Sequence, residues 1–280
     1  MAPAAAAAAG GGAGGIRRHP PRRAPRPGRA DMILQYLRSL IFVGQMYLAM
    51  AVYALIYTPF VLFNRDAAYA AVHAYCRYVR WTARWMVGIR SEVRGEVPEG
   101  EVLIASKHQS FLDIILIVSA LPRPKFIMKA SLVHAPILGW YALRIGCVPV
   151  DRGKRAQAIR QMMDGVTAGD APAGQLIIYP QGTRVAPGAY LPYKVGSAVI
   201  YETTGQTCVP AATNVGLFWP RHGILRKPGL AVVEFLEPLP PGLERHEFLR
   251  RLETEIELAS NRLMQESGYA EPAPSNTLST

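Results

Sequence analysis

The chain has 280 residues, half of them apolar, and 31 basic against 20 acidic side chains give it a net charge of +11 with neutral histidines. This apolar content excludes a chain that is disordered throughout, because disordered chains are poor in apolar residues. Three scattered cysteines are too few for a disulfide framework or a paired-cysteine metal site, and they fit a reducing compartment. The positive charge indicates an anionic partner, which could be nucleic acid, a membrane surface or a phosphorylated substrate.

Residues 1–30 form an Ala/Gly run followed by an Arg/Pro run, with six arginines and no acid. Glycine and proline at this density predict a disordered basic leader. A basic arm that touches anionic lipid is the alternative. Residues 271–280 are predicted to form a disordered tail.

Residues 39–64 contain 26 positions without a formal charge. A helix of that length is roughly 39 Å long, more than the ~30 Å hydrocarbon core of a bilayer, so the stretch predicts a membrane-embedded segment. Arginines flank both ends, and the positive-inside rule draws both ends to the cytosolic side. With Gly44 and Pro59 as possible breaks, we expect a re-entrant segment or a two-helix hairpin rather than one clean span.

Residues 66–88 are predicted to form a second helix, which differs from the uncharged segment before it in carrying basic side chains. Basic side chains recur on one face at helical spacing beside aromatic rings: His73, Arg77, Arg80 and Arg84, with Tyr78, Trp81 and Trp85. This mixture is typical of a helix in the lipid headgroup region. An ordinary amphipathic helix packed on its own domain is the alternative. Residues 31–88 are therefore expected to form membrane-embedded and interfacial helices.

From residue 89 to residue 270, short apolar runs alternate with helical stretches. This order predicts an α/β domain with a mostly parallel sheet flanked by helices, preceded by the membrane-embedded helical segment. Strands are expected at 101–106, 125–128, 147–150, 175–179, 207–212 and 230–235, and helices at 110–120, 132–145, 155–168, 195–204 and 246–266. Ligands bind such sheets at the carboxyl ends of the strands.

His108 follows the predicted strand 101–106 and precedes a helix, a suitable position for a general base, since an unperturbed imidazole titrates near the working pH. Asp113 lies five residues further on. If the chain curls before the helix, this carboxylate can reach the Nδ1–H group, fix the tautomer and stabilise the imidazolium. For this motif alone, a structural histidine is the alternative.

Three more apolar strands end in polar or cationic residues, within 145–152, 176–184 and 208–214. Parallel strands place all of these ends at the edge where His108 should lie. Arginine offers a planar fork for phosphate, and backbone N–H groups around a glycine can add to an anion site.

With these four blocks in this order, residues 102–235 resemble the 1-acylglycerol-3-phosphate O-acyltransferases and related glycerolipid (lysophospholipid) acyltransferases. The resemblance implies transfer of a fatty acyl group from an acyl carrier protein or coenzyme A thioester to the free hydroxyl of a lysophospholipid. The acceptor most simply is 1-acylglycerol-3-phosphate, giving phosphatidic acid in phospholipid biosynthesis. We therefore expect an enzyme at the cytoplasmic face of the inner membrane, with membrane lipid and the thioester carrier as partners and without metal, cofactor or nucleic acid.

Carried over by position, the resemblance makes His108 the base and Asp113 its orienter. It also implies residues that bind the acceptor: Lys129 and Arg184 on the phosphate, Gly182 and Thr183 in the same turn as Arg184, and Arg152 and Lys194 as second-rank contacts. Backbone N–H groups near the Gly182 turn are expected to stabilise the oxyanion.

Two positions depart from the family pattern. The third block commonly reads Phe-Pro-Glu-Gly-Thr-Arg, and Gln181 here lacks the carboxylate of the glutamate. The first block commonly has asparagine before the histidine, and this chain has Lys107. Both changes are expected to raise the local positive charge, which favours an anionic acceptor while leaving a lyso-ornithine or other amino-lipid acceptor open.

Other functions remain open at this point. A thioesterase would use the same pair on water, and a non-catalytic membrane scaffold fits if Gln181 marks a degenerate enzyme. A serine hydrolase is disfavoured because Ser197 lacks the nucleophile-elbow motif, and nucleic-acid binding because no recognition motif is visible. Cys147 and Cys208 lie within apolar strands and are expected to be buried and inert.

Overall fold

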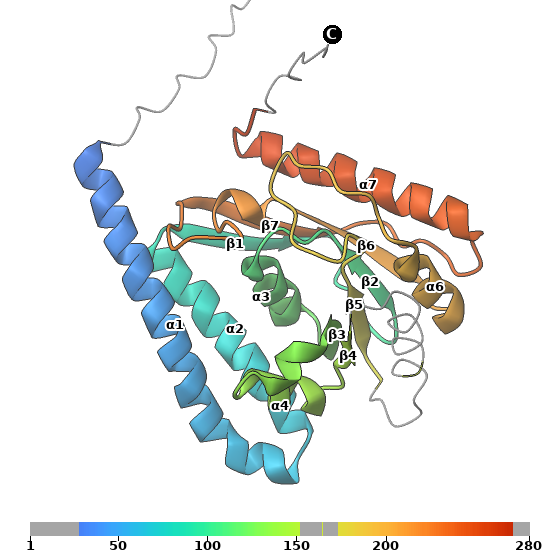
Figure 1. Ribbon diagram of the computed structural model, residues 1–280, viewed down its shortest axis with the longest axis horizontal. Coiled ribbons are helices and arrows are strands. Elements are labelled where there is room, and N and C mark those ends of the chain that lie inside the picture. The colour runs from blue at the N-terminus through green and yellow to red at the C-terminus, as the bar shows by residue number, and fades with distance from the viewer. Residues whose placement is uncertain (1–27, 152–163, 165–172, 271–280) are drawn as a thin grey trace, which may run out of the picture.

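The computed structural model describes residues 28–151, Asp164 and residues 173–270. Within these residues a seven-stranded sheet has the order β1-β7-β6-β2-β5-β3-β4, and helices cover both faces (Figure 1). The strands are β1 (Ile89–Arg94), β2 (Leu103–Ser106), β3 (Pro124–Lys129), β4 (Val148–Val150), β5 (Gln175–Ile178), β6 (Cys208–Thr213) and β7 (Gly229–Phe235). The helices are α1 (Arg29–Phe63), α2 (Asp66–Met86), α3 (Phe111–Ala120), α4 (Leu138–Arg144), α6 (Val195–Thr204) and α7 (Arg245–Glu266), with 3-10 helices η1 (Ala130–His134) and η2 (Val215–Leu217).

The sheet is parallel except at one step. Strands β6, β2, β5, β3 and β4 run in one direction, whereas β7 is antiparallel to β6 and parallel to β1. The predicted α/β fold with a mostly parallel sheet and flanking helices is therefore confirmed. The five co-directional strands end at one edge of the sheet, where the loops that carry the sequence motifs begin.

Apolar side chains on both faces of the sheet explain why the central strands read as continuous apolar runs. On one face, Ile104 of β2 packs in a buried cluster with side chains of α1, α2 and α3. On the other face, its neighbour Leu103 packs with side chains of α6 and α7. Successive residues of β2 thus alternate between the two layers, and this alternation continues into the motif that follows the strand.

Most predicted strands and helices of the α/β domain lie within two residues of their observed ends. Strand β1 was not predicted, because it is an edge strand whose charged side chains interrupt the apolar pattern. The helix expected over 132–145 is divided into η1 and α4, because Pro136 cannot donate a backbone hydrogen bond. The helix expected over 155–168 lies outside the described residues, apart from Asp164.

The apolar N-terminal segment is one continuous helix, so the break expected at Gly44 or Pro59 is wrong. Pro59 removes only one helical hydrogen bond near the end of α1, and the Asn64 N–H still donates to the Phe60 carbonyl at 2.8 Å. The chain then reverses, and α2 packs back along α1 (Figure 1). Among the described helices, α1 is the one long and apolar enough to cross a membrane, judged by length and composition.

The basic residues of α2 do not share one outward face. Arg80 donates to Ser91 Oγ at 2.9 Å and to Ser119 Oγ at 2.8 Å, and His73 Nε2 contacts a backbone carbonyl at the end of α3 at 2.9 Å. These two side chains therefore fasten α2 to the α/β domain, whereas Arg77 and Arg84 are exposed. Of the predicted basic face, two side chains therefore pack on the α/β domain and two face solvent.

Candidate active site

His108 and Asp113 meet in front of the first turn of α3. The chain curls between β2 and the helix, and the Asp113 Oδ1 accepts a hydrogen bond from His108 Nδ1 at 2.9 Å. The aspartate is fully buried, and the histidine side chain is 14% exposed. Because a carboxylate only accepts, this contact assigns the proton to Nδ1 and leaves Nε2 as the nitrogen that can take up a proton.

Asp113 also organises the start of α3. Its second oxygen accepts hydrogen bonds from the backbone N–H groups of Gln109 and Ser110, both at 2.8 Å. Ser110 is the N-cap residue, and its hydroxyl accepts from the Leu112 N–H at 3.1 Å. This reciprocal capping arrangement satisfies otherwise unpaired N–H groups of the helix end and holds the carboxylate facing the imidazole.

The face of the His108 ring is covered by Tyr179, the residue that follows β5. The two rings stack with centroids 3.9 Å apart and planes 18° apart. Burial and the nearby Asp113 carboxylate raise the pKa of the Tyr179 phenol well above its usual value, so this ring stays neutral over the working range. The imidazole is therefore fixed at one edge by a carboxylate and on one face by an uncharged aromatic ring.

The expectation that Lys107 raises the positive charge of the site is wrong. As the alternation of β2 requires, this side chain leaves the sheet on the face opposite to His108. It is 2% exposed, and its ammonium donates to the Glu257 carboxylate of α7. Tyr193 donates to the other oxygen of the same carboxylate at 3.1 Å. The charge of Lys107 is thus neutralised on the far side of the sheet.

The turn after β5 brings Arg184 next to His108. The Val185 N–H donates to the His108 carbonyl at 2.8 Å, which joins the two loops directly. Gly182 has a φ of 71°, a left-handed conformation that glycine adopts without strain. The Gly182 N–H closes the turn onto the Tyr179 carbonyl at 2.8 Å, and the expectation that backbone N–H groups near this turn stabilise the oxyanion stays a prediction.

The other residues predicted to bind substrate lie at varying distances from this turn. Thr183 lies within it, and the Lys194 side chain lies over Gly182, since a Cβ built on that glycine would come within 2.7 Å of the lysine Nζ. Lys129 is exposed at the end of β3, two strands away from β2, and does not line the cavity described below. Arg152 lies outside the described residues.

Gln181, the departure from the family pattern, is buried at 1% exposure. Its side-chain amide donates to the Leu191 carbonyl at 3.2 Å. Its Oε1 is buried without a hydrogen-bond partner among the described residues. The residue therefore supports the loop after β5, and one acceptor oxygen remains unused.

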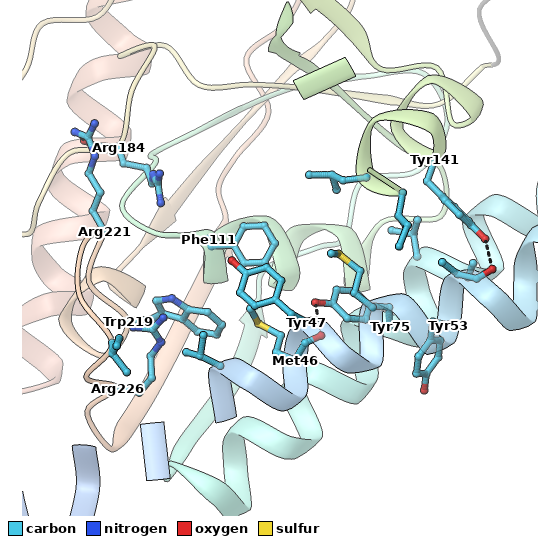
Figure 2. A pocket seen from close by; sticks show the side chains of 18 of the residues that line it. Met46, Tyr47, Tyr53, Tyr75, Phe111, Tyr141, Arg184, Trp219, Arg221 and Arg226 are labelled. Atoms are coloured by element: carbon cyan, nitrogen blue, oxygen red, sulfur yellow. Dashed lines mark hydrogen bonds between the residues drawn. The ribbon is translucent and has the colours of Figure 1, made fainter. Parts of the chain in front are cut away.

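A cavity of about 510 Å³ lies between the α1–α2 hairpin and the α/β domain. Its lining is mostly apolar and aromatic, with contributions from α1, α2, α4 and Phe111 of α3. Three arginines line one end, Arg184, Arg221 and Arg226, whereas Tyr53 and Tyr141 lie at the other end (Figure 2). Sequence reasoning missed Arg221 and Arg226, although the run of aromatic and basic residues at 218–227 is a signal that could have drawn attention to them.

Neither a reactive thiol nor a metal cluster belongs to this site in the described part of the chain. Cys147 and Cys208 are buried, as predicted, and burial raises the pKa of the Cys147 thiol to about 12. No group of three His, Cys, Asp or Glu side chains that could hold a metal ion occurs among the described residues. The described site thus combines an oriented imidazole with a turn, bonded to the His108 carbonyl, whose Arg184 lines the cavity.

Residues 88–214 match the family model described as Acyltransferase. A 1-acyl-sn-glycerol-3-phosphate acyltransferase of Pseudomonas aeruginosa is 29% identical over 160 residues, which cover 56% of this chain and 62% of the relative. The Cocos nucifera protein of the same name is 25% identical over 215 residues, 75% of this chain and 70% of the relative.

The fold also matches a solved structure, the 1-acyl-sn-glycerophosphate acyltransferase PlsC of Thermotoga maritima. The TM-score is 0.69 at 22% identity, and the match covers 82% of this chain and 97% of that one. The resemblance inferred from the four motifs is confirmed: residues 88–214 match the acyltransferase family model, and both relatives are named 1-acyl-sn-glycerol-3-phosphate acyltransferase.

Proposed function

We propose that the protein transfers a fatty acyl group from a thioester to the free hydroxyl of a lysophospholipid, with 1-acylglycerol-3-phosphate as the acceptor and phosphatidic acid as the product. The observation that carries this proposal is the 2.9 Å contact of His108 with a buried carboxylate, close to Arg184 at one end of an apolar cavity. The names of the relatives point to the same acceptor.

The reaction follows from the oriented imidazole. His108 Nε2 removes the proton of the acceptor hydroxyl while its oxygen attacks the thioester carbonyl carbon. The resulting imidazolium is stabilised by Asp113. Collapse of the tetrahedral intermediate breaks the C–S bond, and the thiolate leaves and takes up the proton from the imidazolium. Acyl transfer in this scheme needs no covalent acyl-enzyme, and we propose that an acyl carrier protein or coenzyme A supplies the thiol.

The shape of the cavity supports an amphiphilic acceptor. Arginines at one end suit an anionic head, because the guanidinium fork matches phosphate oxygens. The apolar and aromatic lining of the remainder suits a hydrocarbon chain. Arg184, whose turn is bonded to the His108 carbonyl, would hold the head so that the neighbouring hydroxyl faces the imidazole.

We further propose that the enzyme works on the cytoplasmic surface of the inner membrane through the α1–α2 hairpin. Large apolar side chains of α1 are exposed along its length, among them Leu55 at 79% and Phe63 at 93%. Trp81 and Trp85 of α2 are exposed at 61% and 62% and continue this surface. An exposed apolar area of this extent is typical of a membrane-binding face, and rings of this kind favour the headgroup level.

The test is thiol release by the purified full-length protein from acyl-carrier-protein or coenzyme A thioesters, with and without lysophosphatidic acid. Release that depends on the acceptor supports transfer. Release without the acceptor identifies a thioesterase, and no release by a folded protein leaves a non-catalytic scaffold. A panel of acceptors that includes lyso-ornithine lipid and monoacylglycerol then defines the substrate.

His108→Ala tests the role of the base. The variant should lose acceptor-dependent release while remaining folded, because the Asp113 oxygen that caps α3 keeps its two backbone donors. His222→Ala, an exposed histidine in the loop before β7, is the matched control and should keep full activity. Full turnover by His108→Ala would contradict the mechanism.

A further inference from the structure

The arginine end of the cavity contains a buried cation without a counter-ion among the described residues. Arg226 is 6% exposed and lines the cavity. Its Nη1 donates to the Gly223 carbonyl at 3.0 Å, and its guanidinium lies 4.4 Å above the Trp219 ring. The Nε atom is buried without a hydrogen-bond partner in the described part of the chain.

This arrangement leaves a positive charge uncompensated. No carboxylate is among the described residues that line the cavity, and Arg226 forms no ion pair with any described residue. Burial disfavours the charged form and lowers the pKa of the guanidinium to about 10, and no carboxylate of the described lining offsets this effect. A buried charge is costly unless a partner of opposite sign lies beside it, so this guanidinium favours an anionic ligand.

Two neighbouring arginines reinforce this preference. Arg221 donates from Nη1 to the Arg184 carbonyl at 3.0 Å, which ties the loop before β7 to the turn after β5. Both residues line the same end of the cavity as Arg226 (Figure 2). Planar guanidinium groups are the side chains best matched to phosphate oxygens.

The apolar part of the cavity and its position narrow the class of anion. Most of the lining beyond the arginines comes from apolar and aromatic side chains of α1 and α2, the same hairpin whose outer surface is apolar. The loop that carries Arg226 is joined to α1, because the Arg226 N–H donates to Ser39 Oγ at 2.9 Å and Gln35 donates to the Arg226 carbonyl at 2.9 Å. An anion held here therefore has a hydrocarbon environment on one side.

We propose that Arg221 and Arg226 form a binding site for the phosphate group of a lipid at the arginine end of this cavity. The inference rests on the proposed function in one respect, since the lysolipid acceptor of that reaction is one source of the phosphate. A phosphate headgroup of the surrounding bilayer is the other source. The two sources share one chemistry and are separated by experiment.

Binding is measured on the full chain in the His108→Ala background, so that no turnover is required. Lysophosphatidic acid and monoacylglycerol, which differ by the phosphate, are titrated by calorimetry in detergent. Arg226→Gln should weaken the binding of lysophosphatidic acid by about tenfold or more, the usual effect of losing a charge-assisted contact, and leave monoacylglycerol unchanged. Arg90→Gln removes the same charge from an exposed position of β1 outside the cavity lining and should change neither affinity.

Two further variants keep the proposal testable if Arg226→Gln does not fold, a defect that thermal melting would reveal. Arg221→Gln changes an exposed side chain and should produce a smaller loss in the same direction. Arg226→Lys keeps the charge but loses the planar fork, and its affinity should lie between those of the parent and Arg226→Gln.

Flotation with vesicles identifies the source of the phosphate. Vesicles of phosphatidylcholine with phosphatidic acid are compared with vesicles of phosphatidylcholine alone. A loss for Arg226→Gln only in the first kind of vesicle assigns the site to a bilayer lipid, and a loss in the calorimetric titration assigns it to the acceptor. Both results support a lipid-phosphate site. Unchanged affinities of the Arg221 and Arg226 variants in both assays would overturn it, whereas phosphate-dependent binding without acyl transfer would remove only the proposed function.

Discussion

Replacing Asp113 by asparagine should abolish catalysis while leaving the fold in place. The asparagine carbonyl can still accept the two backbone N–H groups that the carboxylate accepts at 2.8 Å. Its amide group then faces His108 Nδ1 at the position of the present 2.9 Å contact and donates to it. The ring must place its proton on Nε2, and the nitrogen that should remove the substrate proton is blocked.

We expect a decrease in kcat of about 10⁴-fold, as the same exchange produces in a serine protease triad, which corresponds to about 5.4 kcal/mol. The free energy of unfolding should fall by only about 1–2 kcal/mol, since one charge at a helix N-terminus is lost and its acceptor role is kept. Asp113→Ala is the matched variant. It leaves two buried N–H groups without an acceptor, at roughly 1–3 kcal/mol each.

Thiol release in the presence of acceptor gives kcat, and urea titration followed by circular dichroism gives the stability of each variant. The decisive comparison is between the two substitutions, which should be equally inactive but clearly different in stability. A folded Asp113→Asn protein with kcat within tenfold of the parent would refute the assignment of the tautomer and, with it, the role of the carboxylate.

The remaining predictions concern the far face of the sheet, a thiol and the apolar hairpin. Glu257→Gln should lower the free energy of unfolding in urea by about 3 kcal/mol, because Lys107 is left buried without its carboxylate, and adding Lys107→Met should restore most of it. Burial raises the pKa of the Cys147 thiol to about 12, so the thiol should stay protonated at pH 8 and should not react with iodoacetamide until the protein is unfolded. Detection of the labelled residue by mass spectrometry in the native protein would contradict this. Leu55→Asp should weaken vesicle binding at least about tenfold, whereas Leu258→Asp, 67% exposed on α7, should not; equal losses would argue against the hairpin as the membrane face.

The sheet could be predicted from the sequence because its central strands are buried on both faces and form short apolar runs of distinct length. The edge strand β1 could not, since Arg90, Glu92 and Arg94 remain at the surface and break the pattern. The continuity of α1 was also missed. Gly44 and Pro59 are weak helix positions when considered locally, but packing along α2 and a single lost hydrogen bond leave the helix intact.

Those features of the site that depend on residues close together in the sequence could be predicted. His108 and Asp113 are five residues apart, and a helix cap brings them together, so a local pattern was sufficient. Lys107 was misjudged because its partner Glu257 comes from a helix 150 residues further along the chain. Arg226 was missed because only the folded chain places its loop beside α1 and the turn that carries Arg184.

The antiparallel step between β6 and β7 has a consequence for how this fold can change. A parallel neighbour would have required the chain to cross the sheet before its next strand, carrying residues 214–228 away from the catalytic edge. Since β7 instead runs back from that edge, the whole connection stays there, with Arg221 and Arg226 lining the cavity and Phe218 and Trp219 packed in the core. Within this one reversal of the chain, the arginines at the cavity and the side chains that secure the core therefore lie only a few residues apart.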